Sequence, residues 1–436
     1  MSLPAHPPVR PSFREALGVW MKIGLLSFGG PTGQIALMHG EIVEKRRWVS
    51  DARFVHALNY CMLLPGPEAQ QLSIYVGWLL HGVRGGIAAG MLFVLPGAFL
   101  LWGISWLYVS HGTVPAVAAI FYGLKPAVLA IVAFAVLRIS QKILNRRALW
   151  VIAAAAFAGI FWLKLPFPLI VLGAGLVGLL GGCFFPEQFR LKESHGATGV
   201  HVISDDSIGK LAAPDTGRAV RTAILWSVIW AAPLVATGLV FGSGHVLFQE
   251  GLFFSKASLV TFGGAYAVLP YVAQQAVETH GWLTATQMID GLGLAETTPG
   301  PLVLVLQHVG FLGAWSHPAP FSPLAAATLG SLMTTWCTFV PGFLFIFVGA
   351  PYVEAIRANE LLSRALSAIT AAVVGIVLNL AVWFGLNVLL PGGGSVDWFS
   401  LGLTIAAFFA LQKLRWDVIR IVVACGALGF AYRLFL

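Results

Sequence analysis

The stretch "LSFGGPTGQ", residues Leu26 to Gln34, interrupts an apolar segment near the start of the chain. Its three glycines and its proline disfavour a continuous helix, because glycine loses backbone entropy on ordering and proline removes a backbone donor. A second stretch, "VTFGGAYAV" from Val260 to Val268, repeats the Phe-Gly-Gly core in another apolar segment. The fold must therefore accommodate two similar breaks in apolar surroundings.

The composition indicates a protein that lies in a lipid bilayer. Of its 436 residues, 58% are hydrophobic and only 10% are charged, whereas about 25% of residues are charged in a soluble domain. The formal net charge of +8 fits basic loops that fix the orientation of a membrane protein, and we expect no nucleic-acid partner. The four cysteines show no metal-binding spacing and no P-loop is present, so we expect no cofactor, no metal and no enzymatic activity.

Several apolar segments are candidates to cross the roughly 30 Å of hydrocarbon in a bilayer. Five are long enough to do so: 86–109, 117–138, 221–242, 324–348 and 365–390. Shorter apolar runs lie at 149–163, 167–185, 398–412 and 417–435. The sequence therefore predicts nine spanning helices. Residues 186–220 are polar and mixed in charge, which predicts a flexible cytoplasmic linker.

The two halves of the chain are related by an internal duplication. An offset of 234 residues (262 − 28) aligns the Phe-Gly-Gly motif at 28–30 with that at 262–264. The same offset relates Lys22 to Lys256, Trp48 to Trp282, and Pro65-Gly66-Pro67 to Pro299-Gly300-Pro301. Later, Pro96-Gly97 matches Pro341-Gly342 at an offset of 245, so an insertion of 11 residues (245 − 234) separates these motifs. Such periodic self-similarity predicts a repeat architecture.

The charges predict that the second repeat is inverted relative to the first. The segment "EKRRWVSDAR" of the first half carries four basic residues, whereas its counterpart "ETHGWLTATQ" carries neither lysine nor arginine. Basic loops stay on the cytoplasmic side, so the two segments should lie on opposite sides of the membrane. We predict a first repeat at 1–185, the linker at 186–220, a connecting transmembrane helix at 221–242, and a second, inverted repeat at 243–436.

The segments beside each Gly/Pro motif are too short to span a bilayer. We predict four hairpins, with tips at 28–33, 65–67, 262–265 and 299–301, that enter the membrane and return. Such irregular backbone is tolerated where it is buried in protein or lines a cavity. Pairs of short tilted helices would give the same orientation, and this alternative stays open. The predicted fold class is an all-α polytopic membrane protein with an inverted-topology internal repeat and broken or re-entrant helices.

A helix that begins in mid-membrane presents free N–H groups and a partial positive charge, which suit an anion. Paired breaks in inverted repeats point to a transporter site near the bilayer midplane. The expected substrate-binding residues surround the four tips: Lys22, Phe28, Gly29, Gly30, Asn59, Pro65, Gly66, Gln70, Gln71, Lys256, Gly263, Gly264, Thr297, Thr298 and Gly300. The alternatives are that the glycines only allow close helix packing and that the lysines extend to the interface.

Two carboxylates beside the Pro-Gly-Pro motifs are candidates for proton coupling. Glu296 precedes the second motif, at the negative end of an entering half-helix, where a neutral carboxyl group is favoured. Glu68 follows the first motif, where the alternative is simple capping of a helix. The halves also differ, because Gln34 of the first tip corresponds to Val268 in the second. We therefore expect the first tip to contact substrate more directly.

The motif regions resemble a known family. The strings "SFGGPTGQIALMHGEIVEKRRWVSDARFVHALNYCMLLPGPEAQQLSIYVGW" and "TFGGAYAVLPYVAQQAVETHGWLTATQMIDGLGLAETTPGPL" are similar to the two halves of the chromate ion transporter family in its long-chain form. The resemblance covers nearly the whole chain outside the linker. It implies a multi-pass protein of the bacterial inner membrane that exports chromate, with sulfate as a look-alike anion and coupling to the proton motive force.

Other functions remain as alternatives. A sulfate or general oxyanion transporter would use the same tips, and a passive anion channel would show flux without coupling to protons. A membrane enzyme such as a chromate reductase is disfavoured because cofactor motifs are lacking. The expected partners are chromate, sulfate as a second anion, and the lipid bilayer, with a homodimer as one assembly to consider. The N-terminus is predicted to be cytoplasmic.

Overall fold

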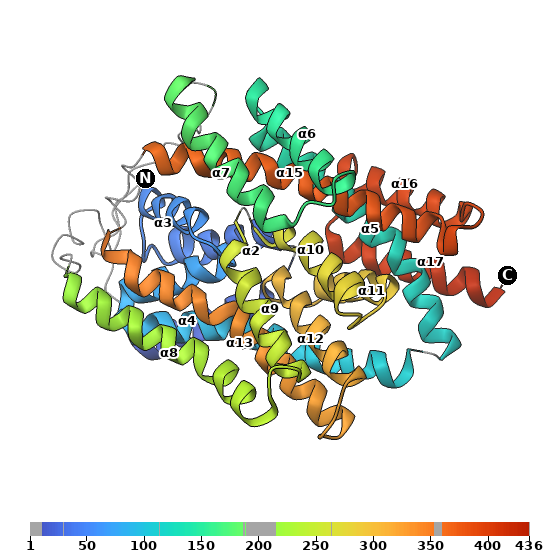
Figure 1. Ribbon diagram of the computed structural model, residues 1–436, viewed down its shortest axis with the longest axis horizontal. Coiled ribbons are helices and arrows are strands. Elements are labelled where there is room, and N and C mark those ends of the chain that lie inside the picture. The colour runs from blue at the N-terminus through green and yellow to red at the C-terminus, as the bar shows by residue number, and fades with distance from the viewer. Residues whose placement is uncertain are drawn as a thin grey trace.

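The structure of the protein is a computed structural model that describes residues 11–28, 30–112, 114–185, 188, 215–262, 264–352 and 360–435. The described part is all-helical (Figure 1). Its first half contains α1 (Phe13–Leu26), α2 (Gly30–His39), η1 (Gly40–Lys45), α3 (Asp51–Leu63), α4 (Glu68–His111), α5 (Pro115–Ile143), α6 (Arg147–Phe161) and α7 (Phe167–Phe184). The second contains α8 (Thr216–Phe241), α9 (Val246–Val260), α10 (Ala265–Ala273), η4 (Gln274–Thr279), α11 (Ala285–Thr297), η5 (Leu302–Leu304), α12 (Val305–Ser316), α13 (Pro323–Gly349), η6 (Ala350–Tyr352), α15 (Glu360–Leu389), η7 (Pro391–Gly393), α16 (Trp398–Gln412) and α17 (Val418–Phe435).

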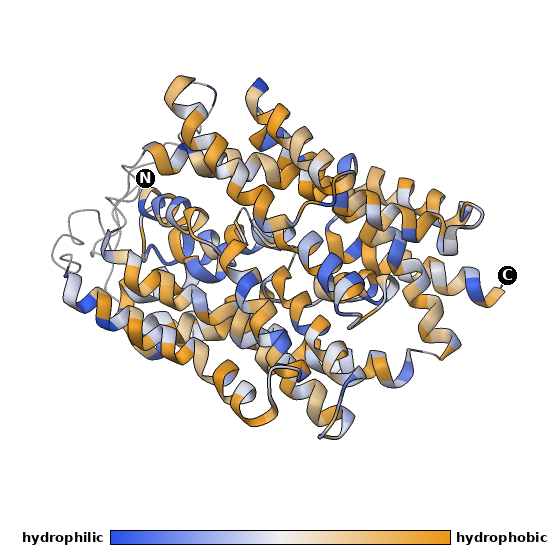
Figure 2. Cartoon of the chain, viewed as in Figure 1, coloured by the Kyte–Doolittle hydropathy of each residue, from blue (hydrophilic) through white to orange (hydrophobic). Residues whose placement is uncertain are grey.

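Every predicted spanning segment is a helix, although two of them are shorter than a full span. Seven helices in the described residues are long and apolar enough to cross a membrane: α4, α5, α7, α8, α13, α15 and α17. Helices α6 and α16 have 15 residues each, or about 22 Å at 1.5 Å per residue. The outer helices α6, α7 and α8 are largely apolar, and hydrophilic residues gather around α3 and α11 (Figure 2). Helix α8 begins at Thr216, inside the predicted linker 186–220.

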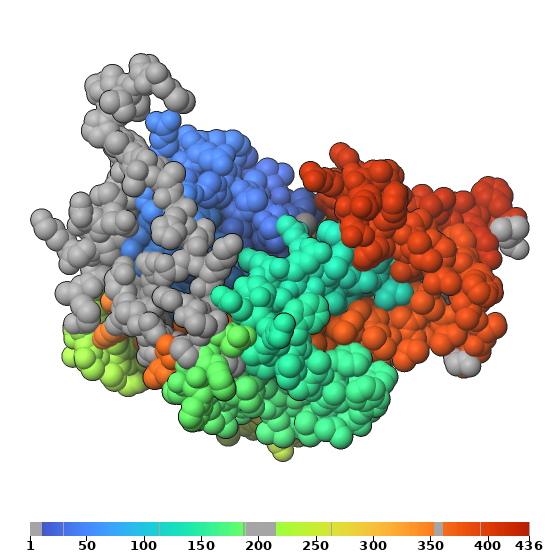
Figure 3. All heavy atoms as spheres, turned by 90° about the horizontal axis from the view of Figure 1, so that it is seen from above, coloured from blue at the N-terminus to red at the C-terminus, as the bar shows by residue number. Residues whose placement is uncertain are grey.

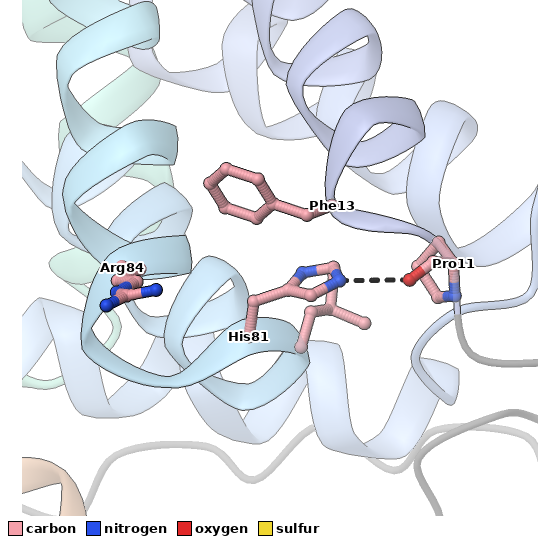
Figure 4. A pocket seen from close by; sticks show the side chains of 5 residues that line it. Pro11, Phe13, His81 and Arg84 are labelled. Carbon is pink, nitrogen blue, oxygen red and sulfur yellow. Dashed lines mark hydrogen bonds between the residues drawn. The ribbon is translucent and has the colours of Figure 1, made fainter.

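Helix α4 joins a short arm to a long spanning helix. At the junction His81 and Gly82 leave the helical conformation, with Gly82 at φ +63°. Glycine adopts this left-handed conformation without steric strain. The imidazole Nε2 of His81 lies 2.9 Å from the carbonyl oxygen of Pro11, and both residues line a shallow pocket with Phe13, Leu80 and Arg84 (Figure 4). The arm that returns from the first Pro-Gly-Pro motif therefore turns here into the spanning part of α4.

Corresponding helices of the two halves have matching lengths. Helices α3 and α11 each have 13 residues, and their first residues are 234 positions apart (285 − 51). The π-helices η1 and η4 each have six residues at the same offset (274 − 40). The pair α6 and α16 shares a length of 15 residues, and the pair α7 and α17 shares a length of 18. The π-helical segments were not expected from the sequence, since the positions of glycine and proline do not predict them.

The two halves exchange helices in the packed structure. Helix α5 packs against α16 and α17, whereas α15 packs against α6 and α7, and α5 and α15 contact each other. Helix α4 packs against α13 in the same way. From above, α1–α4 (blue) and α16–α17 (red) lie toward opposite ends, with α6 and α7 (teal and green) between them (Figure 3). Helix α8 buries no residue fully and lies against α13 and α9. This interleaving brings the broken segments of both halves into the interior.

Candidate functional site

The four Gly/Pro motifs meet through two reciprocal hydrogen bonds. The amide nitrogen of Gly66 donates to the carbonyl oxygen of Thr261 at 2.8 Å, and that of Gly300 donates to the carbonyl oxygen of Ser27, also at 2.8 Å. Both pairs are related by the offset of 234, because 66 and 27 become 300 and 261. Each Pro-Gly-Pro tip thus binds the residue before the Phe-Gly-Gly motif of the other half. The candidate site is built from both halves at once.

Local chemistry explains why the chain breaks at these points. The hydroxyl of Ser27 donates to the carbonyl oxygen of Ile23, and that of Thr261 donates to the carbonyl oxygen of Ala257, each at 2.6 Å. Such back-bonding satisfies carbonyl groups where a helix ends. Four glycines at the tips have φ in the left-handed region, which disfavours any side chain: Gly30 at +71°, Gly66 at +116°, Gly264 at +96° and Gly300 at +98°.

Two glutamines of the first half hold the Pro-Gly-Pro turns. The side-chain amide of Gln34, which is 1% exposed, donates to the carbonyl oxygen of Gly300 at 2.6 Å. The amide of Gln71 donates to the carbonyl oxygen of Pro65 at 2.6 Å. Gln70 is also buried and donates to the carbonyl oxygen of Phe339 at 3.3 Å. The first half therefore supplies polar side chains to both turns, as its extra amides suggest.

The N-termini of α2 and α10 have different surroundings. A Cβ added at Gly264, the residue before α10, would lie 3.4 Å from Oε1 of Glu68. Glu68 also interacts electrostatically with Lys142 of α5. A carboxylate thus lies beside the positive end of α10, as it would at any favourable helix N-terminus. A Cβ added at Gly30, the first residue of α2, would meet no described atom within 4 Å, so space is open beside that end.

Glu296 lies at the second tip with a tyrosine that the sequence did not single out. The hydroxyl of Tyr266 donates to Oε1 of Glu296 at 2.6 Å, and Glu296 is 3% exposed. The hydroxyls of Thr297 and Thr298 donate to carbonyl oxygens of their own helix, at 2.8 and 3.1 Å. In this conformation these threonines satisfy the helix end. Tyr266 lies two residues after the Phe-Gly-Gly motif of the second half, so its place beside a helix break was the signal available in the sequence.

Lys22 has a carboxylate partner in the structure. Its ammonium donates to Oε1 of Glu41 at 2.9 Å, and Glu41 also pairs with Lys45 at 2.6 Å and with Arg46. The hydrogen bond from Lys45 lowers the pKa of Glu41 to about 2; burial opposes this shift, and Lys22 and Arg46 reinforce it. Lys256 is exposed on α9, and the position equivalent to Glu41 is Gln275. The two matched lysines therefore lie in different environments.

The remaining predicted residues lie apart from these contacts. Asn59 is exposed on α3, and Phe28 is half-buried between α1 and α2. Gly29 and Gly263 lie outside the described residues. Cations of α5 were missed by the sequence reasoning: Lys142 interacts with Glu68, and Arg138 interacts with Tyr266. Arg138 ends the predicted span 117–138, and charged residues in a spanning helix are a general sign of function.

The arrangement offers several groups that can interact with an anion. Within the described ranges, no group of three histidine, cysteine, aspartate or glutamate side chains comes together as a metal site would require. The tips offer helix N-termini, an ordered amide at Gln34, and cations of α5 nearby. Two carboxylates, Glu68 and Glu296, lie beside the same tips and can exist with or without a proton. Anion binding and protonation can therefore affect each other at this place.

Both halves of the chain match one family of known proteins. A family model described as "Chromate transporter" matches the chain twice, over residues 14–179 and 248–430. The starts of the two matches differ by 234 residues (248 − 14). No solved structure matches the chain significantly.

Three relatives illustrate the match along the chain. The chain is 34% identical to the chromate transport protein of Pseudomonas aeruginosa, over 97% of this chain and 93% of that protein. It is 28% identical to a probable chromate transport protein of Synechococcus elongatus, over 98% of both chains. It is 27% identical to the chromate transport protein of Cupriavidus metallidurans, over 85% of this chain and 82% of the relative. The similarity therefore extends over both halves.

Proposed function

The chain belongs to the chromate transporter family in its long-chain form, with two family-model halves, and we propose that it is a secondary transporter that exports chromate. The relatives from Pseudomonas aeruginosa and Cupriavidus metallidurans are named chromate transport proteins. The observation that carries the proposal is the reciprocal pair of hydrogen bonds from Gly66 and Gly300, which joins the four helix breaks in two pairs across the halves.

We further propose that the two halves are inverted repeats in the bacterial inner membrane, with a cytoplasmic N-terminus. The equal lengths of α3 and α11 and of η1 and η4, and the exchange of α5 and α15 between the halves, support a twofold relation. The basic residues around Arg46 in the first half, and their absence from the equivalent second-half segment, support opposite orientation. Alternating access then moves one repeat against the other around the shared tips.

Chromate is a tetrahedral dianion, and the first tip offers the better place for it. The open space beside Gly30 lies at the positive end of α2, and Gln34 orders this tip against Gly300. At α10 the corresponding position is next to the Glu68 carboxylate, which would repel a dianion when charged. Lys22 and Lys256 stay predicted substrate contacts. Glu68 and Glu296 are the carboxylates beside the anion that we propose for coupling to the proton motive force.

Counterflow in proteoliposomes tests this function. Vesicles loaded with unlabelled chromate should accumulate radiolabelled chromate, and unlabelled sulfate inside would drive the same uptake if sulfate is also carried. A passive channel would show flux that does not saturate and does not respond to a proton gradient. If purified full-length protein in sealed vesicles gave no chromate counterflow, the proposed function would be wrong.

A further inference from the structure

A second buried polar cluster lies outside the tips, where α11 packs against α4 and α12. Its centre is Asp290 of α11, which is 3% exposed. The hydroxyl of Tyr108 donates to Oδ2 of Asp290 at 2.9 Å. The other carboxylate oxygen, Oδ1, is buried without a hydrogen-bond partner among the described residues. An aspartate buried in a membrane protein with one oxygen unsatisfied is costly to retain, and such residues mark ion or proton pathways.

A buried histidine completes the cluster. His308 of α12 is fully buried, and its Nδ1 lies 2.8 Å from the hydroxyl oxygen of Ser105. Its Nε2 has no partner within the described structure. The imidazole packs on Gly291, where a Cβ would collide with the ring, and it meets the ring of Tyr108 edge-on at 5.5 Å between centroids. Glycine at position 291 therefore makes room for the imidazole beside Asp290.

The titratable groups near Asp290 come from three of the helices packed on α11, namely α4, α5 and α12. On α4 and α12 these are Tyr108 and His308, and on α5 it is Lys125, whose positive charge acts on Asp290. Helix α17 carries Arg433, which lies over the ring of Tyr122 at 4.2 Å instead. Helix α15 carries Arg364, which donates to the carbonyl oxygen of Gly182, and η5 carries no titratable side chain. Among the described residues, Lys125 is thus the cation that acts on Asp290, and Oδ1 of Asp290 has no hydrogen-bond partner there.

The position of the cluster relates it to one face of the membrane. Tyr108 lies three residues before the end of α4 at His111, or about 5 Å along the helix axis. Gly97 of the same helix, which touches Pro299 at the tip, lies 11 residues before Tyr108, or about 16 Å away. Asp290 is the sixth residue of α11, which begins at Ala285. The cluster therefore lies between the C-terminal end of α4 and the shared tips.

We propose that Asp290 is a proton-binding site of the transport cycle, that Tyr108 and His308 position it, and that it exchanges protons with the membrane face where α4 ends. A proton from water binds the free oxygen Oδ1, which converts the carboxylate to a carboxylic acid, and it leaves to water by the same route. No other bond is made or broken. Because α11 carries the second Pro-Gly-Pro tip at its end, neutralising Asp290 changes how firmly this arm is held against α4. This inference rests on the proposed function.

The experiment measures chromate and protons together, with full-length protein in proteoliposomes. Chromate counterflow reports substrate movement, and a pH-sensitive dye reports proton movement that accompanies a chromate gradient. In the variant Asp290→Asn, we expect chromate-driven proton movement to fall about tenfold or more, within the usual range of coupling between two sites. Chromate counterflow should persist, since the tips are intact.

A matched control uses another hydrogen-bonded tyrosine–aspartate pair. Tyr122 donates to Oδ2 of Asp397 at 2.7 Å, and Asp397 also caps α16. The variant Asp397→Asn keeps a capping side chain and should retain proton coupling. If Asp290→Asn does not fold, Tyr108→Phe serves instead. It removes the hydrogen bond that favours the carboxylate, and the pH of half-maximal proton coupling should then move upward.

The outcomes separate the inference from the proposed function. Wild-type protein without chromate counterflow would contradict the proposed function itself. Wild-type coupling that survives in both Asp290→Asn and Tyr108→Phe would overturn only the proton site. Glu250 is another buried carboxylate whose oxygens lack hydrogen-bond partners in the described residues. If Glu250→Gln abolishes proton coupling while Asp290→Asn preserves it, the proton site at Asp290 is likewise overturned.

Discussion

Helices α3 and α11 have the same length and the same place in the two halves, but their buried charged side chains differ. Both have 13 residues and lead to a Pro-Gly-Pro turn, and both are capped by a hydroxyl, that of Ser50 or Thr284. However, α3 carries a buried Arg53, which donates to the hydroxyl of Tyr75 at 2.8 Å, and α11 carries Asp290. The residue equivalent to Asp290 is His56 (290 − 234). Duplication has thus kept the scaffold while the two arms acquired different chemistry.

The retained contacts are mainly those of the backbone. The amide of Trp48 donates to the carbonyl oxygen of Ile42 at 2.9 Å, and the amide of Trp282 donates to that of Ala276 at 2.8 Å. Side chains at equivalent positions differ freely, as Glu41 and Gln275 do. If the repeats are inverted as proposed, the basic arm lies toward the cytoplasm, where chromate would be captured, and the acidic arm lies toward the opposite face.

The largest difference in stability and transport between equivalent substitutions should come from Gly97 and Gly342. A Cβ at Gly97 would collide with the carbonyl oxygen of Pro299, whereas a Cβ at Gly342 (97 + 245) would meet the flexible end of Gln70 at 2.9 Å. We expect Gly97→Ala to cost about 1–3 kcal/mol or more through overpacking and to abolish counterflow. Gly342→Ala should be milder. Thermal unfolding in detergent and counterflow measure both.

The control for this pair is Gly103→Ala, on the same helix as Gly97. A Cβ there would meet no described atom within 4 Å, so stability and transport should stay at wild-type level. Equal losses in Gly97→Ala and Gly342→Ala would contradict the asymmetric packing described above.

The next largest effect on stability concerns Glu41, whose equivalent in the second half is Gln275. Glu41→Gln gives the first half the residue found at position 275 and leaves three cations without their carboxylate. Since the pKa of Glu41 is lowered from 4.5 to about 2, its charge stabilises the folded state at pH above about 4.5, and this contribution is lost as the pH falls toward 2. The variant should therefore be less stable at pH 7 by no more than about 3 kcal/mol, because the partly exposed cations around Glu41 are screened by solvent.

Unfolding of both proteins followed across this pH range checks the sign. The difference in free energy of unfolding should shrink steadily between pH 4.5 and pH 2. A difference that is independent of pH would show that Glu41 contributes by packing and not by charge. Gln275→Glu is the converse change. A smaller benefit is expected there, because Lys22 has an equivalent in Lys256 but the positions of Lys45 and Arg46 hold Thr279 and His280.

A smaller effect on stability is expected at the first tip, where Gln34 lies. Gln34→Leu removes the amide that donates to Gly300 and leaves a buried carbonyl group without this partner. Such a loss costs about 1–3 kcal/mol, and it should raise the KM for chromate because the first tip is less well ordered. Val268→Leu, at the equivalent position of α10, removes no hydrogen bond. An unchanged KM in Gln34→Leu would show that this tip does not contact or order the substrate.

The smallest effect on stability should come from the two lysines. Lys22→Met removes one of three cations around Glu41, and its side chain is 46% exposed, so we expect a loss of less than about 1 kcal/mol. Lys256→Met should change stability even less, because Lys256 is exposed on α9 and has no matching carboxylate. Their effects on KM test whether both bind chromate. A greater loss of stability in Lys256→Met than in Lys22→Met would contradict the environments described here.

Much of the fold could be predicted from the positions of glycine, proline and apolar runs. The breaks at Gly30, Gly66, Gly264 and Gly300 follow from backbone chemistry that acts locally, and so each lies where the motif predicted. The packing of tips could not be predicted, because the bond from Gly66 to Thr261 joins residues nearly 200 positions apart. The cluster of Tyr108, His308 and Asp290 could not be predicted for the same reason, because these residues come from different helices and meet only in the folded chain.

The most direct test is a cryo-electron microscopy structure of the protein in lipid nanodiscs with chromate present. We predict α3 and α11 entering from opposite faces of the disc, with the anion beside Gly30 and Gln34 where the four breaks meet. Chromate bound away from these tips, or α3 and α11 entering from the same face, would contradict the proposal that inverted halves share one anion site.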